Sequence, residues 1–250
     1  MAGTWALVQG AVTVVDDLVL RPARPWTTSV HALLRHLRAR GLDCVPEPVG
    51  VRDGVEALRW IPGDAGPAAW PHQVTAAAVR SAGELLRRVH DATTDYEPPA
   101  EAEWAFPAVP GATVVTHGDP APWNFVWRES RAVALIDWDY AAPGPATDDV
   151  AYAAAGFAPA VPDDEARRVH GFTSVPDRRA RLRAFAEGYR LGGTAGLADR
   201  VVERQEATVA RVADLAERGL EPWAAWVRAG YLDELRSRPR WTRQHRHLLE

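Results

Sequence analysis

The stretch that decides the fold runs from residue 117 to residue 139 and reads HGDPAPWNFVWRESRAVALIDWD. Two apolar runs within it, 125–127 and 132–136, are separated by a polar turn and predict a pair of short strands. Asn124 directly precedes the first run, and Asp137 directly follows the second. Paired strands would hold these two side chains next to each other on rigid elements.

The polar residues of this stretch suit the chemistry of phosphoryl transfer. That reaction needs a carboxylate that accepts the proton of the acceptor hydroxyl, and oxygen ligands that hold Mg²⁺ on a triphosphate. Asp119 offers the first group, while Asn124 and Asp137 offer the second. Asp119 and Asn124 alone could equally form a simple turn. The complete strand–turn–strand arrangement ending in Asp137 favours the catalytic interpretation.

Apolar runs separated by turn residues fill the first quarter of the chain and predict short antiparallel strands. These runs lie at 6–8, 12–15, 18–20, 49–51 and 55–61. Turns are expected at 9–10 and 16–17, and Asp53-Gly54 is a strong signal for a two-residue hairpin between the last two strands. Pro62-Gly63 ends this β-rich region.

Helical periodicity dominates the remainder. One helix is expected among the strands, over 28–40, capped by Thr27, Thr28 or Ser29. Downstream, apolar spacing predicts helices over 74–90, 148–155, 178–189, 197–218 and 222–235. The sequence therefore predicts an α+β fold of two lobes, 1–62 and 64–250, with a hinge near 60–63 and a cleft between them.

Composition and charge limit the classes of binding partner that we expect. A net charge of −4 over 250 residues gives no basic field for nucleic acid. Neither a membrane-spanning apolar run nor a signal-peptide pattern is present, and the single cysteine, Cys44, fits a reducing cytoplasm. We expect a cytoplasmic protein that acts on a small molecule, and the oligomeric state stays open. The sequence contains no lysine, so all 29 basic residues are arginine.

The pattern His-x-Asp-x-x-x-x-Asn, followed by an apolar strand and Ile-Asp, resembles the catalytic and metal-binding loops of the protein-kinase-like superfamily. Its His-Gly-Asp form, with Pro122 before Trp123-Asn124, is similar to the aminoglycoside phosphotransferase and choline-kinase-like family. The motifs IDWD at 136–139, PGP at 143–145 and DDVAY at 148–152 extend the similarity. It is strong over 114–155 and looser over 7–91.

This resemblance implies a two-lobed protein-kinase-like fold, with a small antiparallel sheet lobe containing one helix and a larger, mainly helical lobe. ATP or GTP and Mg²⁺ would be its cofactors. Asp119 would be the catalytic base or would orient the acceptor hydroxyl, and Asn124 and Asp137 would bind Mg²⁺. His117 would brace the loop, and Asp149 would bond the loop backbone from beneath.

Further contacts follow from the same resemblance. Main-chain groups of Trp60 and Ile61, at the expected hinge, would meet the adenine edge. Asp139 could assist a second metal or could be a solvated loop residue. Trp60, Trp123 and Trp138 are the tryptophans most expected to touch a ligand.

The donor side departs from the family pattern. Members usually grip the nucleotide phosphates with a lysine on the third strand, paired to a glutamate on the next helix. Here that strand ends in Arg21, and the helix over 28–40 contains no glutamate. Arg21 is the best substitute and Arg24 the second, although a planar guanidinium is not equivalent to an ammonium group.

These observations leave two functions open. The first is a Mg-dependent phosphotransferase that moves the γ-phosphoryl of ATP or GTP to a hydroxyl of an aminoglycoside-like antibiotic or another hydroxylated metabolite. The second is a catalytically weak pseudokinase, or a nucleotide- or small-molecule-binding protein, because the lysine is missing and the loop at 9–11 has one glycine. Other phosphate-dependent chemistry on the same fold is a third possibility. The presence of Asp119, Asn124 and Asp137 together favours the enzyme, while acids interleaved with arginines give no clean aminoglycoside groove.

Overall fold

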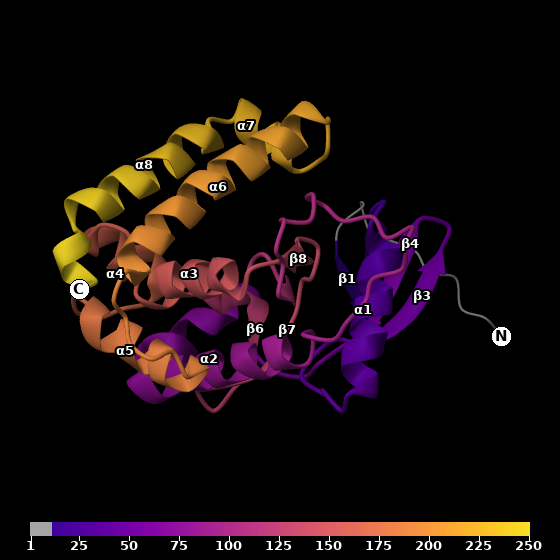
Figure 1. The fold of residues 1–250 in the computed structure, drawn as a ribbon, viewed down its shortest axis with the longest axis horizontal. Coiled ribbons are helices and arrows are strands. Elements are labelled where there is room, and N and C mark those ends of the chain that lie inside the picture. The colour runs from indigo at the N-terminus through magenta and orange to yellow at the C-terminus, as the bar shows by residue number, and fades with distance from the viewer. Residues whose placement is uncertain (1–11) are drawn as a thin grey trace.

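Short apolar runs and tight turns build an antiparallel sheet at one end of the molecule (Figure 1). The computed structural model describes residues 12–250, so the strand expected at 6–8 and the loop at 9–11 lie outside the described residues. Within the described part, this sheet has four strands in the order β1-β2-β4-β3. Their bounds are Thr13–Val15 for β1, Leu18–Pro22 for β2, Pro48–Arg52 for β3 and Val55–Arg59 for β4.

The β3–β4 hairpin turns at Asp53-Gly54, which confirms the prediction. Both residues have positive φ, 51° and 74°, as this two-residue turn requires. Strand β4 also pairs with β2, and in that register Arg21 lies directly opposite Glu56. Directly opposed residues project from the same face of a sheet. The sheet therefore brings an arginine and a glutamate together at one place.

Helix α1, Thr27–Ala39, follows β2 and packs a leucine face into the interior. That face consists of Leu33, Leu34 and Leu37, each fully buried. The predicted side-chain cap is wrong, because the cap position is the buried Trp26. The Thr27 hydroxyl instead accepts a hydrogen bond from the Arg24 amide at 2.8 Å, and Ser29 accepts one from a distant loop amide. These hydroxyls therefore fix loops and do not cap the helix.

The segment after β4 is held against the centre of the molecule. Gly63 has φ of +140°, and a Cβ placed there would lie 2.6 Å from Val126. The next residue, Asp64, exchanges two backbone hydrogen bonds with Trp127, at 3.0 and 2.8 Å. A side chain at Gly63 would therefore push this linker away from the strand that carries Val126 and Trp127.

Most of the remaining described chain is helical, with two small antiparallel strand pairs, β5–β8 and β6–β7, at its centre. In chain order its elements are η1 Gly66–Val74, α2 Ala76–Asp91, β5 Val114–Thr116, η2 Pro122–Asn124, β6 Phe125–Arg128, β7 Arg131–Leu135, β8 Ala142–Gly144, α3 Ala146–Phe157, α4 Asp163–His170, α5 Arg178–Tyr189, α6 Leu197–Glu217, α7 Trp223–Arg228, α8 Tyr231–Gln244 and η3 Arg246–Leu248. Helices α6, α7 and α8 rise above the central strands (Figure 1).

The expected helices at 178–189 and 197–218 are confirmed to within a residue. The single helix expected over 222–235 is wrong, because Gly230, with φ of +94°, separates α7 from α8. Helix α4 was not expected from periodicity, since its sequence DDEARRVH offers few apolar residues. Its ends nevertheless carry local helix signals, three acids in the first turn and Gly171 in the left-handed conformation at the C-cap.

The fold is α+β, a small antiparallel sheet with one helix joined to a mainly helical region, as predicted. One hydrophobic core runs from the leucine face of α1 to the central hairpin and α3. The Leu135 amide also donates to the Cys44 carbonyl at 2.9 Å, which links β7 to the segment after α1. The division into lobes 1–62 and 64–250 stays a prediction. Within residues 12–250, no helix combines the length and the apolar character needed to span a bilayer.

Candidate active site

The β6–β7 hairpin places Asn124 and Asp137 next to each other, because each stands at the open end of one strand. The Ile136 amide donates to the Asn124 carbonyl at 2.8 Å, which joins the two positions directly. Asp137 has φ of 62°, a left-handed conformation that few non-glycine residues adopt. Its side chain is half exposed. The structure thus brings these two predicted metal ligands together.

Asp119 lies beside Asn124 and carries the least satisfied carboxylate of the site. The Asn124 amide nitrogen donates to the Asp119 carbonyl at 2.8 Å and to its Oδ2 at 2.9 Å. Within the described chain, the buried Oδ1 of Asp119 has no hydrogen-bond partner. Because the Asn124 nitrogen faces Asp119, its amide oxygen faces away and is the atom a cation would use.

Burial sets the charge state of Asp119. Desolvation raises the pKa of this carboxyl to about 7, and the charge of Asp137 adds to the rise. The Tyr152 hydroxyl and the Arg204 charge oppose it. A carboxylate with this pKa is suited to accept a proton near neutral pH.

His117 braces the loop through both ring nitrogens. Its Nε2–H donates to the Ile136 carbonyl at 2.9 Å, and its Nδ1 accepts from the Asp119 amide at 3.2 Å. These partners require the neutral ring, and burial lowers the pKa of His117, which keeps the ring neutral. The ring also meets Trp138 edge to face, with centroids 4.7 Å apart. Trp138 is fully buried in this contact and does not reach the cavity.

Asp149, in the first turn of α3, holds the loop from beneath. Its Oδ2 accepts from the His117 amide at 2.6 Å and its Oδ1 accepts from the Gly118 amide at 2.8 Å. The His90 ring bonds the same carboxylate at 3.0 Å. Burial alone would raise the pKa of Asp149, but the hydrogen bond from His90 and the other partners lower it. The carboxylate is therefore ionised where it anchors the backbone.

Arg204 is a site residue that the sequence did not reveal. It lies on α6, is buried, and donates from Nη2 to the Gly118 carbonyl at 2.6 Å. Its guanidinium also stacks over the Tyr152 ring at 4.7 Å. Gly118 has φ of +86°, and a Cβ there would lie 2.2 Å from the Tyr140 carbonyl. The sequence signal that could have identified Arg204 is its position, because it falls at helical spacing from Val201 on the apolar face of the predicted helix.

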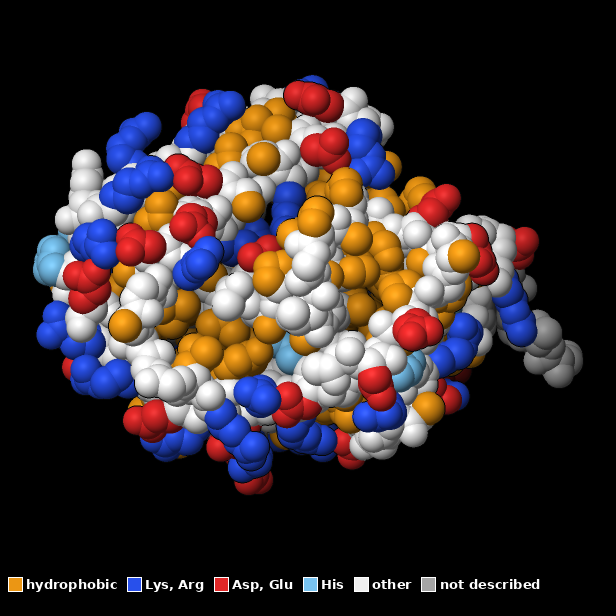
Figure 2. Space-filling view, in the orientation of Figure 1, with side chains coloured by type: hydrophobic (Ala, Val, Ile, Leu, Met, Phe, Trp, Pro, Cys, Tyr) orange, Lys and Arg blue, Asp and Glu red, His pale blue; other side chains and the backbone are white. Residues whose placement is uncertain are grey.

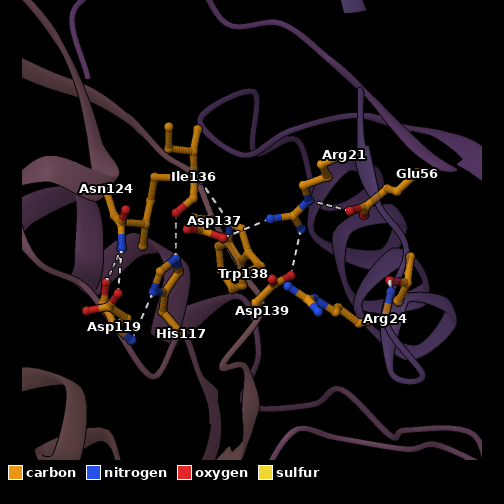
Figure 3. A network of polar contacts seen from close by, with 12 residues as sticks. Arg21, Arg24, Glu56, His117, Asp119, Asn124, Ile136, Asp137, Trp138 and Asp139 are labelled. Carbon is orange, nitrogen blue, oxygen red and sulfur yellow. Dashed lines mark hydrogen bonds and ion pairs between the residues drawn. The ribbon is translucent and has the colours of Figure 1, made fainter. Parts of the chain in front are cut away.

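Arg21 connects the sheet to the end of β7 (Figure 3). Its Nε donates to Glu56, its Nη1 donates to Asp137 at 2.8 Å, and its Nη2 pairs with Asp139 at 2.8 Å. Burial by itself lowers the pKa of Arg21, but the charges of Asp139, Asp137 and Glu56 together raise it. Asp139 is therefore not a freely solvated loop residue. Burial, opposed by Arg21, raises the pKa of Asp139 to about 6.

Glu56 is the second residue that sequence reasoning missed. It is 1 % exposed on β4, where it contacts Arg21 and also accepts from the His31 ring at 2.8 Å. Burial would raise the pKa of Glu56, but the hydrogen bond from His31 and the charge of Arg21 lower it. The acid that α1 lacks is thus supplied by the neighbouring strand, while α1 supplies a histidine. A predicted pairing of the strands at 18–22 and 55–59 would have placed this glutamate opposite Arg21.

One cavity of about 410 Å³ gathers most of the predicted site. Its lining includes five predicted residues, Arg21, Asp119, Asn124, Asp137 and Asp139, and the tryptophan Trp123. Among the described residues that line it, Trp60 and Ile61 are not present. The Trp60 amide donates to the Asp17 carbonyl at 2.8 Å, and its ring is 43 % exposed. The adenine contact expected of these two residues stays a prediction.

The donor set suits a magnesium ion that arrives with phosphate oxygens. In the described chain, no group of three or more His, Cys, Asp or Glu side chains forms a metal cage. Mg²⁺ commonly takes only one or two protein oxygens and completes its shell with water and substrate phosphates. The Asn124 amide oxygen and the half-exposed Asp137 carboxylate match that requirement.

Several known proteins are similar to this chain. The model of the phosphotransferase enzyme family matches residues 97–185. A trifolitoxin immunity protein from Rhizobium leguminosarum bv. trifolii is 37% identical over 188 residues, which are 72% of this chain and 70% of that protein. A homoserine kinase from Granulibacter bethesdensis is 40% identical over 80 residues, 30% of this chain, so the chain matches only 24% of its length.

Solved structures show the same fold. A choline/ethanolamine kinase family protein from Mesorhizobium loti has a TM-score of 0.58 at 15% identity, covering 99% of this chain and 92% of that chain. An amicoumacin kinase in complex with AMP-PNP and Ca²⁺ has a TM-score of 0.56 at 14% identity, covering 87% and 80%. The architecture is therefore that of the two-lobed, kinase-like phosphotransferases.

Proposed function

This chain belongs to the phosphotransferase enzyme family of aminoglycoside phosphotransferases and choline-kinase-like proteins, and from that premise we propose that it transfers the γ-phosphoryl group of ATP to a hydroxyl of a small molecule. One observation carries the proposal. Asp119, whose buried Oδ1 has no hydrogen-bond partner among the described residues, lines the same cavity as Asn124 and Asp137, the two oxygen donors suited to magnesium. This juxtaposition provides a proton acceptor and a metal-phosphate site together.

Each residue has a distinct part in the proposed reaction. Asp119 orients the acceptor hydroxyl and accepts its proton as the oxygen attacks the γ-phosphorus. Asn124 and Asp137 would hold Mg²⁺, which neutralises charge on the phosphates. Arg21 has two N–H groups beyond those it spends on Glu56, Asp137 and Asp139, and these can meet phosphate oxygens. Complexes of structural neighbours with AMP-PNP and ADP support ATP as donor, with GTP as the alternative.

A binding role without turnover is the second candidate, and Arg21 is the observation that favours it. Its guanidinium is already bonded to Asp137 and Asp139, which would compete with phosphate oxygens, and weak nucleotide binding would leave a pseudokinase. The relation to a trifolitoxin immunity protein supports a protective role in which the acceptor is a toxic compound.

Cys44 is free and buried, which supports placement in a reducing cytoplasm.

The test is nucleoside-diphosphate release from Mg-ATP in the presence of hydroxylated acceptors, with the wild type compared to Asp119→Asn. We expect Asp119→Asn to lower turnover by about 10²–10⁴-fold, the usual contribution of a positioned proton acceptor. Binding of Mg-ATP should be retained. Asp95→Asn, at an exposed carboxylate paired with Arg40, serves as the matched control. Turnover of Asp119→Asn equal to that of the control would remove Asp119 from the reaction.

A further inference from the structure

Aromatic rings line much of the cavity. They come from η2, α3, α7, α8 and the loop after β7, and comprise Trp123, Tyr152, Trp223, Trp226, Tyr231 and Tyr140. Several are in contact with one another. Ring centroids are 5.9 Å apart for Tyr140 and Trp223, 6.5 Å for Trp223 and Trp226, and 5.8 Å for Trp226 and Tyr231. We call this set the aromatic wall.

The proposed phosphoryl transfer assigns no direct chemistry to this wall. Trp226 is nevertheless 46 % exposed, although its ring contacts Trp223 and Tyr231, so part of a large apolar ring stays open to a ligand. Hydrophobic side chains also gather in the middle of this face of the molecule (Figure 2). An apolar surface that opens into a cavity next to a proton acceptor is well placed to receive the body of the acceptor molecule.

One charge on the wall disfavours a class of acceptor, namely cations that would stack on Trp223. Among the described residues lining the cavity, the carboxylates are confined to Asp119, Asp137 and Asp139 at the catalytic end. The charge on the wall itself is positive, because the Arg24 guanidinium lies 5.1 Å from the Trp223 ring centre. The guanidinium already makes the favourable contact between a cation and this aromatic ring. An acceptor cation that stacked on the same ring would be repelled by it.

The neighbouring hollow contains acids that one arginine partly compensates. That hollow, about 300 Å³, shares Trp123, Tyr152 and Tyr231 with the main cavity and contains Glu165 and Glu234. Arg238 pairs with both of them, at 2.9 and 2.7 Å. One guanidinium thus compensates one of these two charges, and the hollow offers extra volume for a large acceptor body.

We infer that the acceptor is an uncharged alcohol built on an aromatic or flat apolar body, which stacks on the aromatic wall while its hydroxyl reaches Asp119. This inference rests on the proposed phosphotransferase function. Offset and edge-to-face ring contacts favour such a body, since the exposed Trp226 and its neighbours present both faces and edges. Aminoglycosides and choline, which are cations, are disfavoured by Arg24.

Binding and turnover are measured separately so that the two ideas can fail separately. The probes are a naphthyl alcohol, a flavonol, a macrolactone, the trimethylammonium analogue of the naphthyl alcohol, choline and kanamycin. Each is titrated by tryptophan fluorescence and calorimetry with Mg-AMP-PNP present, and then tested for nucleoside-diphosphate release from Mg-ATP. The variants are Trp226→Ala and the control Val175→Ala, at another exposed hydrophobic position outside this cavity.

We expect uncharged ring compounds to bind at least tenfold more tightly than the cations, and Trp226→Ala to raise their Kd roughly tenfold with nucleotide affinity unchanged. The charged analogue should bind worse than its uncharged parent, and Val175→Ala should match the wild type. Preferred binding of kanamycin, choline or the charged analogue overturns the inference, as does binding unaffected by Trp226→Ala or absent for every uncharged probe. Ring binding without any phosphoryl transfer would instead sink the proposed function and leave the aromatic wall as a binding site.

Discussion

Glu56 receives Arg21 on one side and His31 on the other, in a position that water does not reach. A buried carboxylate is retained only when its charge is compensated, and here two partners from different elements do so. The arrangement holds the guanidinium in place beside Asp137. Glu56 is therefore a positioning residue that acts through Arg21.

Replacing the charge at this position should affect nucleotide binding more than the chemical step. In Glu56→Gln, Arg21 loses one of three carboxylates, and we expect a roughly tenfold weaker affinity for Mg-ATP together with a stability loss of about 1–3 kcal/mol. Calorimetric titration and urea denaturation measure the two effects. Glu47→Gln, at an exposed glutamate, is the control. Unchanged affinity for Mg-ATP in Glu56→Gln would contradict a role for the Arg21–Glu56 pair in donor binding.

His170 gives the fold a dependence on pH. Burial, with the positive charges of Arg238 and Arg181, lowers the pKa of this ring from 6.5 to about 4. Between pH 6.5 and 4 the unfolded chain therefore binds a proton that the folded chain does not, so the free energy of unfolding falls as pH falls through this window. The full effect is about 3 kcal/mol.

We expect His170→Gln to flatten this part of the stability profile. The comparison is the free energy of unfolding from pH 7 to pH 4 for the wild type, His170→Gln and the exposed His247→Gln. Subtracting the variant profile from the wild-type profile isolates the histidine from the many carboxylates that titrate nearby. A difference that does not change with pH would show that His170 titrates normally in the folded protein.

Most of the groups that we propose to take part in the reaction were predictable from the sequence because they lie on one short hairpin. Asn124 and Asp137 need only strand periodicity and a turn to be placed together. Glu56 was not predictable in the same way, since its role depends on which residue of β2 it opposes. Trp138 was expected near the ligand but packs on His117 instead, because a motif gives spacing and does not give side-chain direction.

At the scale of elements, helix α6 reaches across the molecule to the catalytic loop. The bond from Arg204 to the Gly118 carbonyl spans 86 residues of sequence, and Thr208, one turn further along α6, accepts from the same side chain. Helical periodicity predicts α6 but cannot tell which loop its buried arginine will meet. The break at Gly230 was not predicted for a related reason. Glycine can adopt helical backbone angles as well as a positive φ, and the sequence alone does not say which one the fold uses.

Removing the α6 contact should lower turnover with little change in donor affinity. In Arg204→Met the Gly118 carbonyl loses its partner, and we expect kcat to fall roughly tenfold because Asp119 is less well positioned. Arg200→Met, at an exposed arginine of the same helix paired with Glu203, is the matched control. Steady-state kinetics with Mg-ATP varied will separate kcat from KM. A change confined to the KM for ATP would place Arg204 on the donor side.

At the scale of the whole molecule, the bonds of Arg21 join the sheet to the helical region across the cavity. Carboxylates from β4 and from the segment after β7 meet on a single guanidinium (Figure 3). Family patterns describe each region by itself, so this connection appears only once the two regions are packed together. We therefore expect a ligand bound in the cavity to change the free energy of unfolding of the whole chain.

Ligand binding should therefore be visible in thermal unfolding. With Mg-ATP at 100 times its Kd, we expect about 2.7 kcal/mol of stabilisation, which is a rise in Tm of about 5–10 °C for a protein of this size. Asp137→Ala should remove most of that rise, because it lacks a proposed metal ligand. Differential scanning calorimetry of both proteins with and without Mg-ATP makes the measurement. A wild-type Tm unmoved by millimolar Mg-ATP would count against a nucleotide-dependent enzyme.

Under the proposed function, the contact between Arg21 and Asp137 has a consequence for the order of binding. A lone magnesium ion that took the Asp137 oxygen bonded to Arg21 would leave Arg21 with two carboxylate partners, Glu56 and Asp139, in place of three. A nucleotide that carries its own magnesium brings a cation for the carboxylate and phosphate oxygens for the guanidinium in a single exchange. We therefore expect Asp137 to take magnesium more readily from the metal–nucleotide complex than as the free ion.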